Sequence, residues 1–298
     1  MSISKRHHYI PQFLIKGFVS DDKKLSVFDR KENVFLASRK SPKQVFYEWN
    51  RNLFEKDGEK TDFVEKLFSN TENKFAPAYT RIINKIGKGT NKYVDLFHMI
   101  HYLGTLYNSL PQNDIKISKY VQNSNFKDLG FSIKSKNTNK GVSQEEIEKL
   151  QIRFKSDLAF EQLIKLWKGI TDYLEVDIIE FYKTCKLYHA ETDVRLHILG
   201  DRPFLLKNEE VSSIYESEFI FPLSKGVTLY RYLGKELKEI SAEDRINVDL
   251  LIFLQSKHMV CGPDKSYLTA IANVALKYDT QKKIKYLEDK VFKIFEKE

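Results

Sequence analysis

The residue types best suited to chemistry gather near the start of the chain, in the run Lys5-Arg6-His7-His8-Tyr9-Ile10-Pro11-Gln12. A neutral imidazole can act as a base, an acid or a metal ligand near pH 7. Because a proline favours extended backbone before it, successive side chains should point to opposite sides, so His8 and Tyr9 should not share a pocket. The histidines are either functional groups placed by an apolar anchor or solvated groups on a segment that is pinned to the core.

Two further patterns place titratable groups together. His98 and His101 lie three residues apart on a predicted helix, so they share a face and could bind one metal if a carboxylate approached. The alternative is a hydrogen-bonded pair on a core helix. Asp201 lies between two short apolar segments, where a turn would present its carboxylate at a strand end; the alternative is an Asx turn that bonds its own backbone.

The elements that must position these groups begin with a predicted β-hairpin from Leu25 to Phe35. Apolar residues then recur at helical spacing over 61–86, with a kink expected at Pro77 and a stop at Gly87 and Gly89. A second helix is predicted over 94–109. The polar stretch 112–140 lacks this periodicity, which predicts a mobile loop and a candidate domain boundary.

The second half begins with a capping box at Ser143 and Glu146, which predicts a helix start. Apolar residues keep a helical period over 160–185, which predicts one helix of about seven turns. Four short strands are predicted after Arg195, in LHILG, PFLLK, EFIFPL and VTLYRYL, followed by helices over 241–254, 264–277 and the C-terminal segment. The predicted fold class is α+β, mostly helical with a small antiparallel sheet. The chain forms one domain over 1–298, or two lobes, 1–111 and 141–298, joined by 112–140.

The composition excludes several classes of protein. Of 298 residues, 42% are hydrophobic and 30% are charged, which is typical of a globular chain. No apolar run is long enough for a membrane span and the N-terminus lacks a signal-like apolar segment, so we expect a cytoplasmic protein without membrane contact. The two cysteines, Cys185 and Cys261, should be buried thiols. Phosphate-binding loops, dinucleotide motifs, and the common zinc and serine-hydrolase motifs are absent from the sequence.

A net charge of +8 and a pI near 9.1 favour polyanionic partners. Lys5 and Arg6 could contact phosphates, and the 16 tyrosines could stack on bases. The lysines are interleaved with 41 acidic residues, so a solvated surface explains them equally well.

The segment from His7 to Phe18 resembles a family of mostly bacterial proteins catalogued as domain of unknown function 4238. The resemblance continues, in the family's order, through the segments Val27-Phe28-Asp29-Arg30, Glu65 to Glu72, Leu199-Gly200-Asp201-Arg202-Pro203, Phe221-Pro222-Leu223-Ser224, Asn247 and Lys257 to Cys261. Two departures stand out: the segment Leu106 to Pro111 lacks the arginine that is common there, and the turn at Asp201 keeps only the carboxylate and the proline of the usual pattern.

The resemblance implies an association with defence against bacteriophage. It also carries over His8, Gln12, Glu72 and Asp201 as the polar motif positions, which we expect to converge on one cleft. The leading hypothesis is a nuclease-like effector acting on nucleic acid, with His8 as acid or base, Gln12 orienting, and Glu72 and Asp201 as ligands of Mg²⁺ or as electrostatic stabilisers. The alternatives are a non-enzymatic binding or sensing module, and an enzyme acting on a small metabolite such as a nucleotide or a modified amino acid.

Overall fold

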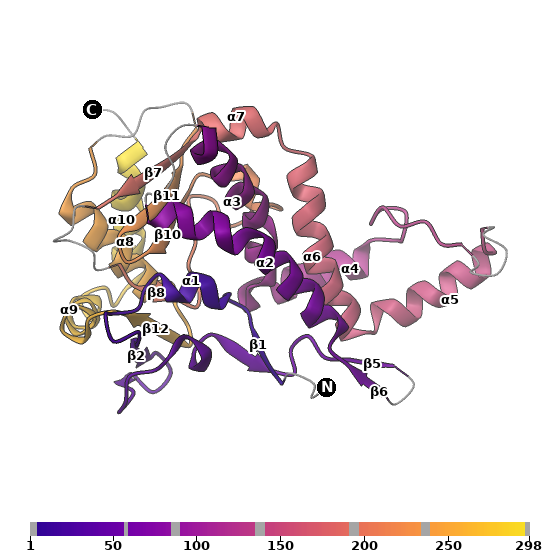
Figure 1. Ribbon diagram of the computed structural model, residues 1–298, viewed down its shortest axis with the longest axis horizontal. Helices are drawn as coiled ribbons and strands as arrows, with labels where there is room; N and C mark the ends of the chain where they lie inside the picture. The colour runs from indigo at the N-terminus through magenta and orange to yellow at the C-terminus, as the bar shows by residue number, and fades with distance from the viewer. Residues whose placement is uncertain are drawn as a thin grey trace.

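The computed structural model describes residues 5–56, 59–84, 90–134, 141–190, 197–233 and 239–295. It is an α+β fold, as predicted, in which helical layers surround small antiparallel sheets (Figure 1). The central sheet has the strand order β7 (Cys185–His189), β11 (Val227–Arg231), β10 (Phe219–Ser224), β9 (Leu205–Leu206). Its neighbouring strands are all antiparallel.

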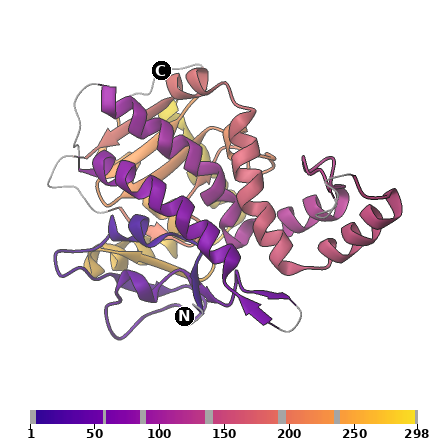
Figure 2. The same ribbon diagram turned by 45° about the vertical axis from the view of Figure 1, so that its right-hand side comes forward.

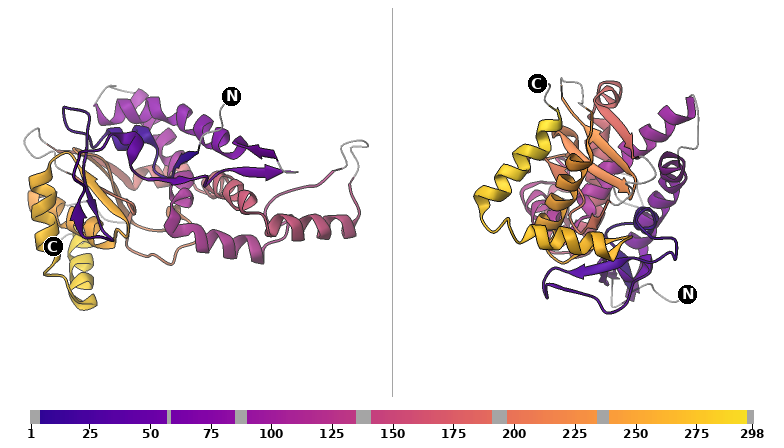
Figure 3. Two further views of the ribbon diagram at one scale, coloured as in Figure 1. Left: turned by 90° about the horizontal axis from the view of Figure 1, so that it is seen from below. Right: turned by 90° about the vertical axis from the view of Figure 1, so that its left-hand side faces the viewer.

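Helices cover both faces of the central sheet. Phe219, Phe221 and Leu223 of β10 pack into one core together with helices α2 (Phe63–Ile83) and α3 (Thr90–Ser109). Ile220 points into a second core, formed with α8 (Ala242–Gln255), α9 (Lys265–Ala275) and α10 (Gln281–Phe292). A strand buried on both faces needs apolar residues at every position, which explains the unbroken sequence FIFPL. The end-on view in Figure 3 shows α8 to α10 on the outer side of this sheet.

A second four-stranded sheet joins distant parts of the chain. Its order is β3 (Val34–Phe35), β2 (Ser26–Asp29), β12 (Met259–Gly262), β8 (Leu199–Gly200). Strands β2 and β3 are the predicted hairpin. The four strands predicted after Arg195 are also confirmed, as β8, β9, β10 and β11, but β8 belongs to this second sheet.

The N-terminal segment lies beneath α2 and α3 (Figure 2). Strand β1 (Arg6–His8) pairs with β4 (Tyr47–Trp49), and the short helix α1 (Gln12–Lys16) follows Pro11. Ile10, Leu14 and Phe18 are fully buried in the first core. Other short elements are the 3-10 helices Pro42–Gln44, Pro111–Asn113, Ile214–Glu216 and Lys293–Phe295, and the paired strands β5 (Phe54–Lys56) and β6 (Glu59–Thr61).

Helices 61–86 and 94–109 are confirmed as α2, a single helix that contains Pro77, and α3. The expected stops at Gly87 and Gly89 lie outside the described residues. The helices predicted over 241–254 and 264–277 are confirmed as α8 and α9.

The prediction of a loop over 112–140 is wrong for residues 114–123, which form α4 (Asp114–Asn123). Its buried residues, Ile117 and Val121, are four positions apart and form a small cluster with Phe160 and Ile164 of α6 (Leu158–Leu174). Two apolar positions are too few to reveal a helical period in the sequence. They are enough to hold the helix once it packs against α6. The predicted capping box does start a helix, α5 (Gln144–Lys155), which projects from the body beside α4 (Figures 1 and 2).

The prediction of one helix over 160–185 is also wrong. Helix α6 ends at Leu174, and α7 (Ile178–Lys183) begins after Asp177, whose carboxylate accepts hydrogen bonds from the first amides of α7. Strand β7 then starts at Cys185. Aspartate is one of the residues that favour the start of a new helix. Asp177 therefore indicated the break, but the continuous apolar spacing suggested a single helix.

A close crossing of α3 and α6 sets the position of the candidate site. A Cβ added to Gly169 would lie 2.5 Å from the amide nitrogen of Thr105, and one added to Gly104 would lie 2.8 Å from the carbonyl oxygen of Gly169. Both distances are far shorter than a side chain tolerates, so only glycine permits this approach. It brings the C-terminal half of α6 against the C-terminal half of α3.

Candidate functional site

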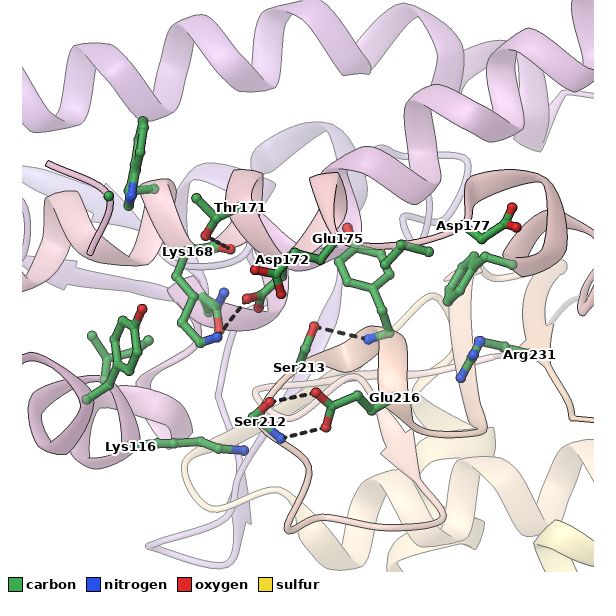
Figure 4. Close-up of a pocket in the computed structure, with 18 of the residues that line it drawn as sticks. Lys116, Lys168, Thr171, Asp172, Glu175, Asp177, Ser212, Ser213, Glu216 and Arg231 are labelled. Atoms are coloured by element: carbon green, nitrogen blue, oxygen red, sulfur yellow. Dashed lines mark hydrogen bonds and ion pairs between the residues drawn. The ribbon is translucent and has the colours of Figure 1, made fainter. Parts of the chain in front are cut away.

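A cavity of about 910 Å³ lies where α3, α4, α6 and α7 meet the 3-10 helix η4 (Ile214–Glu216) and strand β11 (Figure 4). Cavities that hold small ligands usually measure about 300–1,000 Å³. The aromatic lining includes Tyr120, Trp167, Phe181 and Tyr215. The cavity is therefore large enough for a small organic molecule, with apolar walls and charged groups among them.

One face of α6 supplies the polar side of the cavity. Lys168, Thr171, Asp172 and Glu175 follow one another at steps of three, one and three residues, which places them on one side of a helix. The Lys168 ammonium lies 2.7 Å from Oδ1 of Asp172, and only 12% and 9% of these side chains are exposed. Lys168 also lies 5.1 Å from the centre of the Tyr120 ring.

The second oxygen of Asp172 is held less completely. Burial raises the pKa of this carboxyl, whereas Lys168 and the polar groups of Ser213 and Asn108 lower it, and burial is the largest of these effects. Oδ2 of Asp172 and Nδ2 of Asn108 are buried and complete no hydrogen bond in the described part of the chain. A carboxyl with a raised pKa, fixed through one oxygen, is the kind of group that can accept or donate a proton.

The opposite wall is anchored to α3 by Tyr215. Its hydroxyl donates to the carbonyl oxygen of Ile100 at 2.8 Å and accepts from the amide of Gly104 at 3.1 Å. These two backbone groups are four residues apart, so the hydroxyl is inserted between partners that usually bond each other in a helix. The insertion fixes η4 beside α3.

Two cationic groups complete the lining. Lys116 of α4 donates to the carbonyl oxygen of Val211, and burial, followed by the charge of Lys168, lowers its pKa. Arg231 of β11 donates to the carbonyl oxygen of Ser217, and its guanidinium lies 4.4 Å from the centre of the Phe181 ring. Burial lowers the pKa of Arg231 as well.

The residues predicted from the N-terminal motif lie elsewhere, in and after β1. His7 is fully buried, and its Nδ1 accepts a hydrogen bond from the amide of Asn52 at 2.7 Å. His8 is half-buried beside Tyr47; burial lowers its pKa, and its Nε2 completes no hydrogen bond within the described residues. Gln12 is half-buried at the first position of α1.

The two predicted carboxylates have separate surroundings. Burial and the neighbouring Glu65 raise the pKa of Glu72 to about 8. Asp201 is buried, and its two oxygens accept the amides of Lys257 at 3.0 Å and His258 at 2.7 Å, which pins the loop before β12 to the end of β8. In the part of the chain that the structure describes, no hydrogen bond or ion pair joins His8, Gln12, Glu72 and Asp201 to one another. The roles given to these four residues stay predictions.

The structure also places the remaining candidates. His101 stacks on Tyr173 at 4.2 Å between ring centres, and Phe75 packs edge-on against both His98 and His101. Within the described ranges, no group of three or more His, Cys, Asp or Glu side chains is arranged to hold a metal ion. The Mg²⁺ expectation for Glu72 and Asp201 stays untested.

Sequence reasoning missed the cavity residues because each pair looks ordinary in the sequence. Lys168 and Asp172 have the spacing of an exposed helix pair. The available signal was Gly169 between them, since a glycine inside an apolar helix often marks a close approach of another element.

The fold and cavity define a protein of α+β architecture with a partly open polar cavity. A family model described as a protein of unknown function, DUF4238, matches residues 6–258, and the chain belongs to this family, as the resemblance indicated. No curated protein and no solved structure matches the chain. In the described part of the chain, no helix is long and apolar enough to cross a membrane.

Proposed function

We propose that the protein is an enzyme that binds a small metabolite in the cavity between α6 and η4 and uses Asp172 for proton transfer. The observation that carries this proposal is the buried Lys168–Asp172 pair at the wall of a cavity of about 910 Å³. Lys168 fixes Oδ1, while Oδ2 lies near the polar groups of Ser213 and Asn108 and completes no hydrogen bond in the described part of the chain. Titratable groups with shifted pKa values inside a cavity of this size are typical of functional sites.

A binding screen with a blocked cavity tests this proposal. Nucleotides, amino acids and amines would be screened against the full chain by thermal shift, and hits would be measured by calorimetry. We expect at least one compound class to bind, and Thr171→Trp, which fills the cavity, to abolish that binding. Leu174→Trp is the matched control, because Leu174 lies on the same helix, is 72% exposed and does not line the cavity. Binding that survives Thr171→Trp in folded protein would refute the proposal, as would a screen in which no class binds.

A second candidate is the anti-phage effector acting on nucleic acid, as a nuclease or as a binding module, in the cytoplasm. The observation that favours it is an exposed basic and aromatic group on the β1–β4 sheet. The guanidinium of Arg6 lies 5.1 Å from the ring centres of both Tyr47 and Trp49, Trp49 is 58% exposed, and Lys5 is exposed next to them. Stacking on aromatic rings beside cations is a common way to bind single strands.

Expression in bacteria separates the two candidates. The wild-type chain would be compared with soluble His8→Ala and Asp201→Ala while growth and the integrity of RNA and DNA are followed. Loss of nucleic-acid integrity that both substitutions abolish would support a nuclease with these residues in its site. Intact nucleic acids in cells expressing the wild type would count against it.

A further inference from the structure

We propose that the ligand of the α6–η4 cavity is a small organic cation that carries two or more amino or guanidinium groups. This inference rests on the proposed function, since it names the class of ligand for the same site. Among the described residues, six carboxylates line the cavity against three cationic side chains. The carboxylates belong to Asp128, Asp172, Glu175, Asp177, Glu180 and Glu216. The local charge is therefore opposite in sign to the net charge of +8.

The three cationic side chains are already engaged by the protein. Lys168 is paired with Asp172 and lies over an aromatic ring. Lys116 donates to a backbone carbonyl oxygen. Arg231 donates to another through one terminal nitrogen and packs on Phe181, whereas its Nε is buried and completes no hydrogen bond within the described residues. These three cations neutralise part of the negative charge of the lining. An anionic ligand would compete with their present contacts.

Three of the six carboxylates have partners: Glu216 accepts two hydrogen bonds from Ser212, Glu180 pairs with Lys183 and Asp128 accepts from the amide of Asn125. The other three are less fully engaged. Asp172 is nine-tenths buried and its Oδ2 completes no hydrogen bond in the described structure. Glu175 is exposed and makes no ion pair or side-chain hydrogen bond within the described ranges. Asp177 is exposed and uses only Oδ1 to cap α7. At the end of α6 and the start of α7, the charge left available to a ligand is therefore negative.

The arrangement of these groups favours more than one cationic centre on the ligand. Asp172, Glu175 and Asp177 follow one another along the end of α6 and the start of α7 (Figure 4). A flexible amine that lies along this row could meet successive carboxylates while its carbon chain packs on Trp167 or Phe181. Ammonium and guanidinium groups also bind favourably to aromatic faces. A polyphosphate or a nucleic-acid strand would meet repulsion along the same row.

Calorimetric titration of the full chain with spermidine and agmatine tests this inference, with AMP as the anionic comparison. We expect both amines to bind the wild type and AMP not to bind. The double variant Glu175→Gln/Asp177→Asn should weaken amine binding about tenfold, because each exposed ion pair lost is worth up to about fivefold in affinity. Asparagine keeps the capping role of position 177.

The matched control is Glu145→Gln/Glu148→Gln, which removes two exposed charges from the projecting helix α5. It should leave amine binding within twofold of the wild type. If amine binding is weakened equally in both double variants, the amines are attracted to the negative surface charge in general, and the inference is overturned. If only AMP or a neutral compound binds and Thr171→Trp blocks it, the cavity is a site and the ligand class is wrong. If Thr171→Trp blocks nothing, the proposed function fails as well.

Discussion

Replacing Glu72 by glutamine should change how the stability of the protein depends on pH. The pKa of this carboxyl lies at about 8 in the folded chain, against an ordinary value of 4.5, because burial and the neighbouring Glu65 disfavour its charge. Between these two values the folded chain holds a proton that the unfolded chain releases. Raising the pH through this window therefore destabilises the folded state.

The size of the effect follows from the shift. Each pKa unit corresponds to about 1.4 kcal/mol, so the full shift of Glu72 corresponds to roughly 5 kcal/mol. This contribution to the free energy of unfolding is fully present below pH 4.5 and is lost as the pH rises through 8. By pH 7 about 3 kcal/mol of it has been lost. Glutamine has a similar shape and does not ionise, so Glu72→Gln should remove this dependence.

Urea denaturation of the wild type and of Glu72→Gln at pH 5, 6, 7 and 8 measures this pH dependence. The stability of Glu72→Gln relative to the wild type should rise by roughly 1.2 kcal/mol per pH unit from pH 5 to pH 7, and by slightly less between pH 7 and pH 8. Glu148→Gln, at an exposed position on α5, is the control and should follow the wild type. A constant difference between Glu72→Gln and the wild type would show that the carboxyl is ionised throughout, and the argument from burial would be refuted.

The Glu72→Gln variant also tests whether Glu72 binds Mg²⁺. Thermal melts test two further predictions about packing. If Glu72 is a ligand, Mg²⁺ at pH 8 should raise the melting temperature of the wild type but not of Glu72→Gln, whereas equal shifts would exclude the role. Gly169→Ala should cost at least ~2 kcal/mol because the new methyl group meets α3, while Gly141→Ala, whose Cβ would meet nothing within 4 Å, should be close to neutral. His197→Ala should cost roughly 3 kcal/mol, since the buried imidazole lies 2.7 Å from Oδ1 of Asp249 and 2.8 Å from Oγ1 of Thr228; a loss below ~1 kcal/mol in thermal melts would contradict this.

The secondary structure was predictable where a single local signal was strong. The capping box at Ser143 and the apolar periods of α2 and α3 depend only on residues a few positions apart, so they can be recognised in the sequence. Helix α4 escaped prediction because its stability depends on burial of Ile117 and Val121 against α6, which is a contact between distant segments. The break after α6 escaped because the apolar residues of α7 and β7 happen to continue the same period.

The candidate site was not predictable from motifs for a related reason. The N-terminal histidines are the most conspicuous chemical groups in the sequence, yet the structure uses His7 to bind the amide of Asn52 inside the core. Lys168 and Asp172 look like a surface pair, and only the approach of α3 and η4 turns them into a buried pair beside a cavity. Burial comes from tertiary packing, so local spacing alone does not reveal it.

The net charge shows how a property of the whole chain can mislead about a site. An excess of eight positive charges favours polyanions at long range, where only the sum of the charges matters. Within a cavity the nearest groups dominate, because the surrounding protein screens them less than water does. The lining around Asp172 has twice as many carboxylates as cations. A basic exterior and an acidic cavity are therefore compatible, and the ligand of the cavity should be inferred from the groups that would touch it.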